Sequence, residues 1–264
     1  MLRQRILSTV ILLPCAAAII WFGNPWFSLL IVAVAILCGY EFYRMVTYSN
    51  QQPLTYFGLF WVLLLVLSPY CPNINVAPVL ITLAVVLPLV WFVYRQSKEK
   101  AFNSWAWTVA GILYVGWMLS YWVKIGLFDE GRNLVLLAIL TTIATDIGAF
   151  FIGRTWGKHR LSPVISPKKT WEGAIGGFLS AILVCSIFGM LLFSSLDYWQ
   201  IALLGCLISI FAQLGDLVES LLKRNVGVKD SGRLIPGHGG VLDRIDSHVF
   251  VGVVVYYYIV WVVM

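Results

Sequence analysis

The sequence predicts an all-α integral membrane protein, a polytopic helical bundle with about nine transmembrane helices. The chain of 264 residues is 60% hydrophobic and only 11% charged, and its mean hydropathy is +0.88. These values lie outside the range of soluble domains. Apolar runs near the length needed to cross a bilayer recur along the whole chain, and the basic residues follow them in a regular pattern.

Each span is placed on an apolar run, and its ends are set by the charged residues and prolines that interrupt the run. Glu41, Pro53 and Pro69 blur the ends of the second and third spans. The start of the chain has the basic and apolar pattern of a signal peptide, but the apolar run continues through Trp21 and Phe22, which favours an uncleaved first helix. The predicted spans are residues 6–23, 25–43, 54–70, 76–94, 105–127, 133–153, 173–195, 199–222 and 248–264.

The basic residues predict the orientation of these spans. With nine spans, sixteen of the eighteen Lys and Arg residues lie on the same side as the N-terminus, and only Lys124 and Arg132 lie near the other side. Cytoplasmic loops carry the excess of Lys and Arg. We therefore expect a multi-pass protein of the inner (plasma) membrane whose N-terminus is cytoplasmic and whose C-terminus is outside.

The chain has no linker, low-complexity tract or internal repeat, which predicts a single membrane domain over residues 1–264. Its five cysteines are scattered and form no CxxC pair, so zinc and thiol-redox motifs are excluded. The residues that could do chemistry are concentrated in the C-terminal part, residues 140–250.

The most charged window of the chain runs from Asp216 to Asp246. It holds five acids, five bases, a histidine and five glycines. Charged groups are costly in an apolar protein, by about 2.5–3.5 kcal/mol each at a bilayer centre. A dense cluster of both signs therefore indicates a site for ions, phosphates or both.

The eighth predicted span ends with four polar residues on one helical face, because they are spaced i, i+3, i+4 and i+7. They are Asp216, Glu219, Ser220 and Lys223. Asp216 follows an apolar stretch, so it is expected to face the bundle interior and to meet a cation. A structural ion pair with a lysine or arginine remains an equal alternative.

The loop that follows is rich in glycine and charge. Glycines let backbone N–H groups approach a phosphate closely, although a glycine-rich turn between two spans is common. Asp243 and Asp246 come just before the last span and can point the same way if that helix begins here. Carboxylates from two chain regions with bases between them suit an oxygen-ligated divalent ion such as Mg²⁺, while a salt-bridge cage would use the same residues. The candidate ligand contacts in this loop are Lys229, Asp230, His238 and Arg244.

A second group of polar residues surrounds the start of the seventh span. Asp146 lies inside the preceding apolar run. Ser166, Lys168, Lys169 and Thr170 bring two cations and two hydroxyls to a helix N-terminus, which favours an anion site, although Thr170 could be only a cap. Gly173, Gly176 and Gly177 in the same span are expected to permit close helix packing.

The segment from Ser220 to Asp246 resembles the signature of phosphatidate cytidylyltransferases, also called CDP-diacylglycerol synthases. The shared pattern is S-L-L-K-R, then K-D-S-G, P-G-H-G-G and D-R-I-D at fixed spacing. The segments that begin at Asp146 and at Ser166 also resemble motifs of that family. Residues up to about 130 are similar only in length and hydropathy.

The resemblance implies that CMP is transferred from CTP to phosphatidic acid, giving CDP-diacylglycerol and pyrophosphate. It implies Mg²⁺ bound by Asp216, Asp243 and Asp246, with Ser220 and Lys223 beside them and Arg224 among the substrate contacts. A second cation and a homodimer are left open; the lipid bilayer is a partner, and no nucleic acid is expected. A CTP-dependent lipid or polyprenol kinase, and less favourably a cation transporter, are the alternatives.

Overall fold

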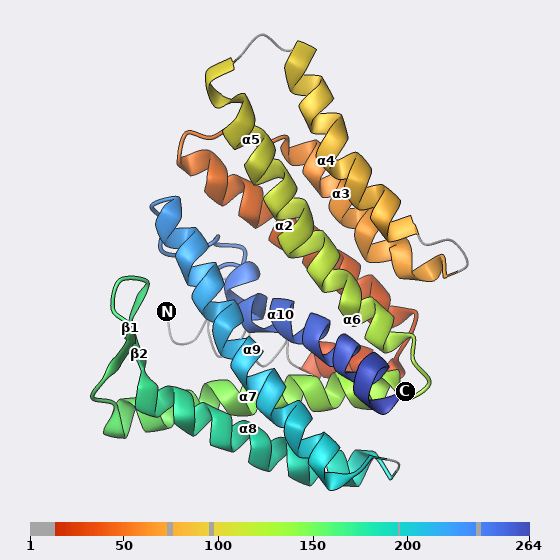
Figure 1. The fold of residues 1–264 in the computed structure, drawn as a ribbon, viewed down its shortest axis with the longest axis vertical. Coiled ribbons are helices and arrows are strands. Elements are labelled where there is room, and N and C mark those ends of the chain that lie inside the picture. Colours follow the sequence, from red (N-terminus) through yellow and green to blue (C-terminus); the bar gives the residue numbers. More distant parts are fainter. Residues whose placement is uncertain (1–13, 73–75, 95–97, 195, 236–238) are drawn as a thin grey trace. The chain divides into compact units, whose positions relative to one another are not determined.

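The computed structural model describes residues 14–72, 76–94, 98–194, 196–235 and 239–264 (Figure 1). It is built from helices, with one small two-stranded sheet. The chain divides into two compact units, each made of separate stretches of sequence. The first contains residues up to Lys124 together with Asn225–Arg244, and the second contains Ile125–Arg224 and Ile245–Met264. That the whole chain acts as one membrane domain stays a prediction.

The first unit is a bundle of apolar helices. It contains α2 (Trp26–Tyr48), α3 (Thr55–Leu67), a short 3₁₀ turn η1 (Ser68–Tyr70), α4 (Val76–Tyr94), α5 (Lys98–Gly111), the π-helical turn η2 (Ile112–Trp117) and most of α6 (Met118–Gly126). At its centre the buried ring of Tyr43 packs against Gly58 and Gly111, and its hydroxyl donates to the carbonyl oxygen of Thr108 at 2.8 Å. The two glycines leave the space that the ring fills, so α2, α3 and α5 approach one another closely.

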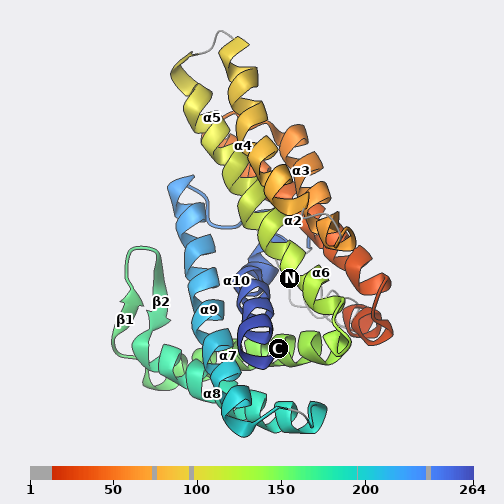
Figure 2. The same ribbon diagram turned by 45° about the vertical axis from the view of Figure 1, so that its right-hand side comes forward.

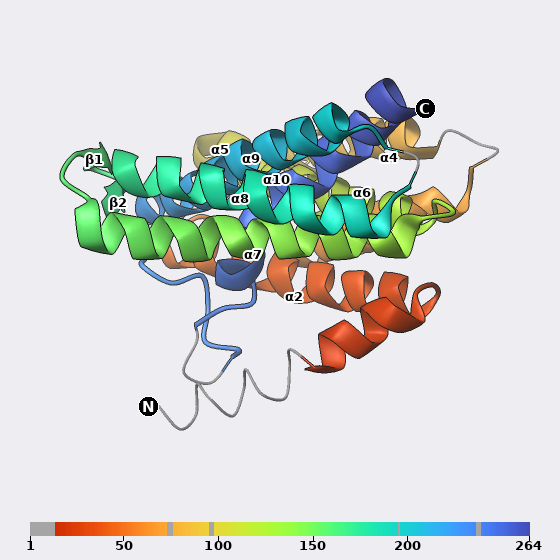
Figure 3. The same ribbon diagram turned by 90° about the horizontal axis from the view of Figure 1, so that it is seen from below.

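The second unit is organised around a pair of adjacent helices, α7 (Gly131–Trp156) and α8 (Trp171–Leu192). They run side by side along their length (Figure 3). A Cβ on Gly177 would lie 2.6 Å from the carbonyl oxygen of Thr145, and one on Gly173 would lie 2.8 Å from that of Ala149. Gly176 packs on Ile152 in the same way, which confirms that the three glycines permit close packing.

The second unit is completed by α9 (Tyr198–Asn225) and by most of α10 (Leu242–Tyr258), which continues as the π-helical turn η3 (Ile259–Val263). Gly205 of α9 packs on Ala181 and Cys185 of α8, and the side-chain amide of Gln213 donates to the carbonyl oxygen of Ala174 at 3.2 Å. The helix α9 ends with Lys223 and Arg224, whose charges suit the negative end of the helix dipole.

The sequence analysis did not predict the β-hairpin that joins α7 to α8. Its strands are β1 (Arg160–Ser162) and β2 (Ser166–Thr170), paired antiparallel with Arg160 opposite Thr170. Figure 2 shows the hairpin at the end of the α7–α8 pair. The strands are too short and too polar to show an alternating strand pattern. The segment lies between two long apolar runs, so it was predicted only as a loop between two spans.

The all-α membrane fold is confirmed. The described residues contain seven helices long and apolar enough to cross a membrane, and a shorter apolar helix at Thr55–Tyr70. The first predicted span begins outside the described residues, but residues 14–22 are helical. The last helix begins at Leu242 rather than at residue 248, so Asp243 and Asp246 both lie in its first turns. A hydropathy criterion places the helix start too late because these first residues are charged.

Candidate active site

Three carboxylates gather in the second unit, each supplied by a different helix. Asp146 comes from α7, Asp216 from α9 and Asp246 from α10. Each is close enough to the others for their charges to interact. All three side chains remain at least partly exposed, so a ligand can reach them. The structure therefore brings together carboxylates separated by up to one hundred positions, of which the sequence analysis grouped only Asp216 and Asp246.

The close approach of α9 and α10 positions two of these carboxylates. A Cβ on Gly215 would lie 2.7 Å from the carbonyl oxygen of Asp246 and 3.2 Å from the Cα of Ser247. A side chain at position 215 would therefore push the two helices apart. The glycine next to Asp216 lets that residue and Asp246 share one small volume.

The cation that Asp216 was expected to meet is Lys169. Its Nζ lies 2.6 Å from Oδ2 of Asp216. The side chains of Lys169 and Asp216 are largely buried, at 26% and 31% exposed. Lys169 also interacts electrostatically with Asp146. The two sequence constellations, one at the start of α8 and one at the end of α9, therefore form a single cluster.

The hydroxyl and the second lysine predicted on α9 flank this cluster. The Oγ of Ser220 donates to Oδ1 of Asp216 at 3.5 Å, which confirms that the two residues share a helical face. Lys223 is buried and forms an ion pair with Glu219, one turn earlier. Its charge also acts on Asp246. Lys223 is therefore shared between a structural ion pair and the carboxylate cluster.

The hairpin presents its two lysines differently because successive side chains of a strand point to opposite faces. Lys169 reaches Asp216, whereas the side chain of Lys168 is exposed. Thr170 caps α8 by accepting the backbone N–H of Gly173 at 3.2 Å, so its capping role is confirmed. Ser166 pairs with Ser162 in the sheet.

Glu172 holds the start of the hairpin in place. Its carboxylate accepts the backbone N–H groups of Lys158 at 3.1 Å and His159 at 3.2 Å, and it lies 2.6 Å from Nδ1 of the His159 ring. The sequence analysis gave neither Glu172 nor His159 a role. An acid in the first turn of α8 was the available signal, because such acids are stabilised by the helix dipole and are near the preceding loop.

The loop between α9 and α10, residues 226–241, carries much of the family signature and is called the signature loop below. It belongs to the first unit, and Asp243 accepts hydrogen bonds from its backbone. Both carboxylate oxygens of Asp243 accept the backbone N–H of Ser231, at 3.2 and 3.0 Å, and Oδ2 also accepts that of Gly240 at 2.9 Å. Asp243 therefore fixes the loop by backbone hydrogen bonds. Four predicted contact residues have exposed side chains, and His238 lies outside the described residues; the four are Arg224, Lys229, Asp230 and Arg244.

Glu41 is a second carboxylate that contacts this loop, and the sequence analysis assigned it no function. It lies on α2 and its side chain is buried. Its Oε2 accepts the backbone N–H of Leu242 at 2.9 Å and the hydroxyl of Ser231 at 3.3 Å. The available signal was an acid inside an apolar run, a feature that was used only to locate the end of the second span.

The carboxylate cluster fits a divalent ion that is shared with phosphate oxygens. Within the described part of the chain, no three His, Cys, Asp or Glu side chains are grouped so that they could hold a metal ion by themselves. Mg²⁺ in phosphoryl-transfer sites is usually held by one or two carboxylates together with substrate phosphates and water. The interacting pair of Asp216 and Asp246 meets that requirement, and the Lys169 ammonium already pairs with Asp216 where a cation is needed.

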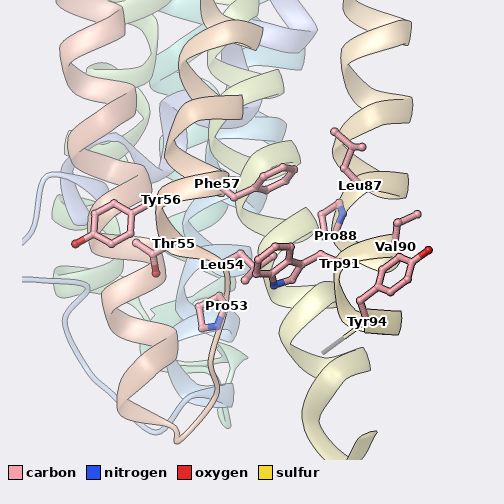
Figure 4. Close-up of a pocket in the computed structure, with 10 residues that line it drawn as sticks. All are labelled: Pro53, Leu54, Thr55, Tyr56, Phe57, Leu87, Pro88, Val90, Trp91 and Tyr94. Atoms are coloured by element: carbon pink, nitrogen blue, oxygen red, sulfur yellow. The ribbon is translucent and has the colours of Figure 1, made fainter. Parts of the chain in front are cut away.

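A groove of about 710 Å³ lies elsewhere in the first unit, between the start of α3 and the end of α4 (Figure 4). Its walls carry prolines, aliphatic side chains and the aromatic rings of Tyr56, Phe57, Trp91 and Tyr94. None of the predicted site residues that the structure describes lines it. Its apolar character suits hydrocarbon rather than phosphate.

Comparison with known proteins identifies the family. A model of the cytidylyltransferase family matches residues 3–262. A phosphatidate cytidylyltransferase of Synechocystis sp. is 36% identical over 287 residues, covering 97% of this chain and 96% of the relative. One of Bacillus subtilis is 34% identical, covering 95% and 94%, and one of Staphylococcus epidermidis is 46% identical over 156 residues, 59% of each chain. The chain belongs to the phosphatidate cytidylyltransferase (CDP-diacylglycerol synthase) family.

Proposed function

We propose that this membrane protein transfers CMP from CTP to phosphatidate, giving CDP-diacylglycerol and pyrophosphate. Its family membership over nearly the whole chain carries the proposal. The cluster of Asp146, Lys169, Asp216 and Asp246 supports it, because nucleotidyl transfer depends mainly on positioning phosphates and neutralising their charge.

In the proposed reaction an anionic phosphate oxygen of phosphatidate attacks the α-phosphorus of CTP. The new P–O bond forms as the bond between the α-phosphorus and the bridging oxygen breaks, and pyrophosphate leaves with that electron pair. Because the nucleophile is already an anion, the enzyme needs no strong general base. We expect direct in-line transfer without a covalent enzyme intermediate, with Ser220 orienting a phosphate or completing the site beside Asp216.

The residues divide the work by charge. Lys169 lies at the end of the hairpin that joins α8, and it would exchange its ion pair with Asp216 for one with a substrate phosphate. The exposed Lys168 would attract the phosphates of the substrates. Asp216 and Asp246 would hold Mg²⁺, and Asp243 is assigned to the same ion from its motif position. When bound, Mg²⁺ would neutralise phosphate charge and align the two substrates. Arg224, Lys229, Asp230, His238 and Arg244 are further candidates for substrate contacts.

A product assay tests the reaction directly. The purified protein is incubated with phosphatidate, Mg²⁺ and CTP labelled in the α-phosphate, and the lipid and soluble products are separated. We expect labelled CDP-diacylglycerol and an equal amount of pyrophosphate, with neither product formed when phosphatidate is omitted. Release of labelled CDP with an unlabelled lipid product would instead identify a CTP-dependent lipid kinase.

Replacing Lys169 with alanine is expected to lower kcat/KM by about 10- to 100-fold, because hydrogen bonds to charged groups contribute about 1.5–3 kcal/mol. Lys168→Ala is expected to have a smaller effect, mainly on KM, because its side chain is exposed. Lys158→Ala serves as the control, since that lysine is also exposed and lies at the hairpin. Unchanged kinetics in both single variants and in the double variant would show that the lysines only set topology.

The predicted orientation places the hairpin and the signature loop in the cytoplasm, and it rests on the distribution of Lys and Arg. In a variant without native cysteines, Arg160→Cys and Arg233→Cys are expected to resist an impermeant thiol reagent in sealed cells and to react after permeabilisation. Both native side chains are exposed, so access is not limited by burial. Asp197→Cys, between α8 and α9, is expected to react from outside. Ready labelling of either of the first two in sealed cells would contradict the orientation.

A further inference from the structure

The buried carboxylate of Glu41 fastens the signature loop to the N-terminal helices. Glu41 is only 1% exposed. It accepts hydrogen bonds from Ser231 and Leu242, which follow it by 190 and 201 positions. These two residues stand at opposite ends of the loop that carries the signature glycines. One side chain on α2 therefore binds residues on both sides of the signature glycines, which are distant from it in sequence.

The loop closes on Glu41 without space for additional side chains. A Cβ built on Gly232 would collide with Oε1 of Glu41, and one built on Gly240 would meet Oε2 and the Oγ of Ser231. A side chain at either position would therefore displace this carboxylate from its place against the loop backbone. Gly232 and Gly240 belong to the K-D-S-G and P-G-H-G-G segments, so the contact with Glu41 accounts for part of the signature itself.

Two carboxylates accept hydrogen bonds from both sides of this loop. Ser231 donates its hydroxyl to Glu41 and its backbone N–H to Asp243. Gly240 donates its backbone N–H to Asp243, and Leu242, two residues further on, donates to Glu41. Ser231, Gly240 and Leu242 are thus held jointly by Glu41 and by Asp243, an acid that the family signature contains. Removing either acceptor would leave buried donors unsatisfied.

The energetic cost of this arrangement indicates a function. A buried carboxylate in a membrane-spanning helix is destabilising unless hydrogen bonds compensate it, and among the described residues only Oε2 of Glu41 accepts hydrogen bonds while Oε1 has none. An apolar residue at position 41 would pack on α2 at no such cost, but it could not hold the loop. We propose that Glu41 is a positioning residue of the enzyme, which holds Ser231 and Leu242 and thereby orients Asp243. The kinetic part of this inference rests on the proposed function, whereas its structural part does not.

Proteolysis combined with kinetics tests the inference. Arg233 is exposed and lies inside the fastened segment, so trypsin cleavage after Arg233 reports on local opening of the loop. The variants are Glu41→Ala, which removes the acceptor, and Glu41→Gln, which keeps one acceptor oxygen and removes the charge. Met45→Ala is the control, because Met45 lies one turn further along α2 and is also 1% exposed.

Glu41→Ala is expected to speed cleavage after Arg233 and to lower kcat, each by about tenfold or more, with a smaller change in the KM for CTP. Glu41→Gln is expected to restore most of both properties. Met45→Ala is expected to lower thermal stability without selective cleavage after Arg233 or selective loss of kcat. Wild-type cleavage in Glu41→Ala, or equal defects in the glutamine and alanine variants, would overturn the proposal.

A milder variant keeps the test decisive if Glu41→Ala does not fold. Ser231→Ala removes one of the two hydrogen bonds to Glu41 from the loop side and leaves α2 intact. We expect a few-fold increase in cleavage after Arg233, and an unchanged cleavage rate would count against the proposal. If the wild-type protein made no CDP-diacylglycerol, the proposed function would fall, while the cleavage rates would still decide whether Glu41 holds the loop.

Discussion

Asp216→Asn is expected to lower kcat by at least about 100-fold, equivalent to about 2.7 kcal/mol of transition-state stabilisation, while the protein still inserts and folds. The amide has nearly the shape of the carboxylate, so packing around α9 is preserved. Lys169 loses the anion that lies 2.6 Å from its Nζ, and the proposed Mg²⁺ site loses a charged ligand. The substitution therefore alters the electrostatics of the site without altering its shape.

The measurement is CDP-diacylglycerol formation across a Mg²⁺ titration, with thermal stability in detergent recorded in parallel. Asp197→Asn is the matched control, because it makes the same chemical change at an exposed acid just before the same helix. We expect the control to keep the wild-type rate. A near-wild-type rate in Asp216→Asn at limiting Mg²⁺ would show that Asp216 is not a metal ligand.

Asp243→Asn is expected to cause a loss of similar size, but with a structural consequence that Asp216→Asn lacks. The Asp243 carboxylate accepts backbone N–H groups from Ser231 and Gly240. An amide offers one acceptor oxygen, and its NH₂ group would face a backbone donor. We therefore expect both lost turnover and faster trypsin cleavage after Arg233.

Comparing the two asparagine variants separates the roles of the two acids. Lost turnover with unchanged cleavage is expected for Asp216→Asn, and lost turnover with faster cleavage is expected for Asp243→Asn. If Asp243→Asn lost activity without opening the loop, its backbone hydrogen bonds would not explain the defect and a ligand role alone would. Full activity in this variant would exclude both roles.

Much of the fold could be predicted because bilayer spans are specified by local composition. The fourth predicted span, residues 76–94, coincides with α4, and the seventh and eighth differ from α8 and α9 by at most three residues at either end. Prediction was less successful where polar residues begin a helix, as at Leu242. It also missed the β1–β2 hairpin, whose strands are three and five residues long.

The site could be predicted only in part, because spacing along one helix is local and contacts between helices are not. The i, i+4 relation between Asp216 and Ser220 followed from helical geometry and is confirmed. The pairing of Asp216 with Lys169 required α9 to pack beside the hairpin, which no periodicity reveals. The contact of Glu41 with Leu242 spans 201 positions and joins to the signature an acid that was used only to locate the end of a span.

The distance in sequence between Glu41 and its partners has a consequence for biosynthesis. At about 5–20 residues per second, the ribosome needs about 10–40 s to make the 201 residues that separate Glu41 from Leu242. During that interval α2 carries an acid whose eventual donors do not yet exist. The first unit can therefore reach its final state only after Leu242, the first residue of α10, has been made.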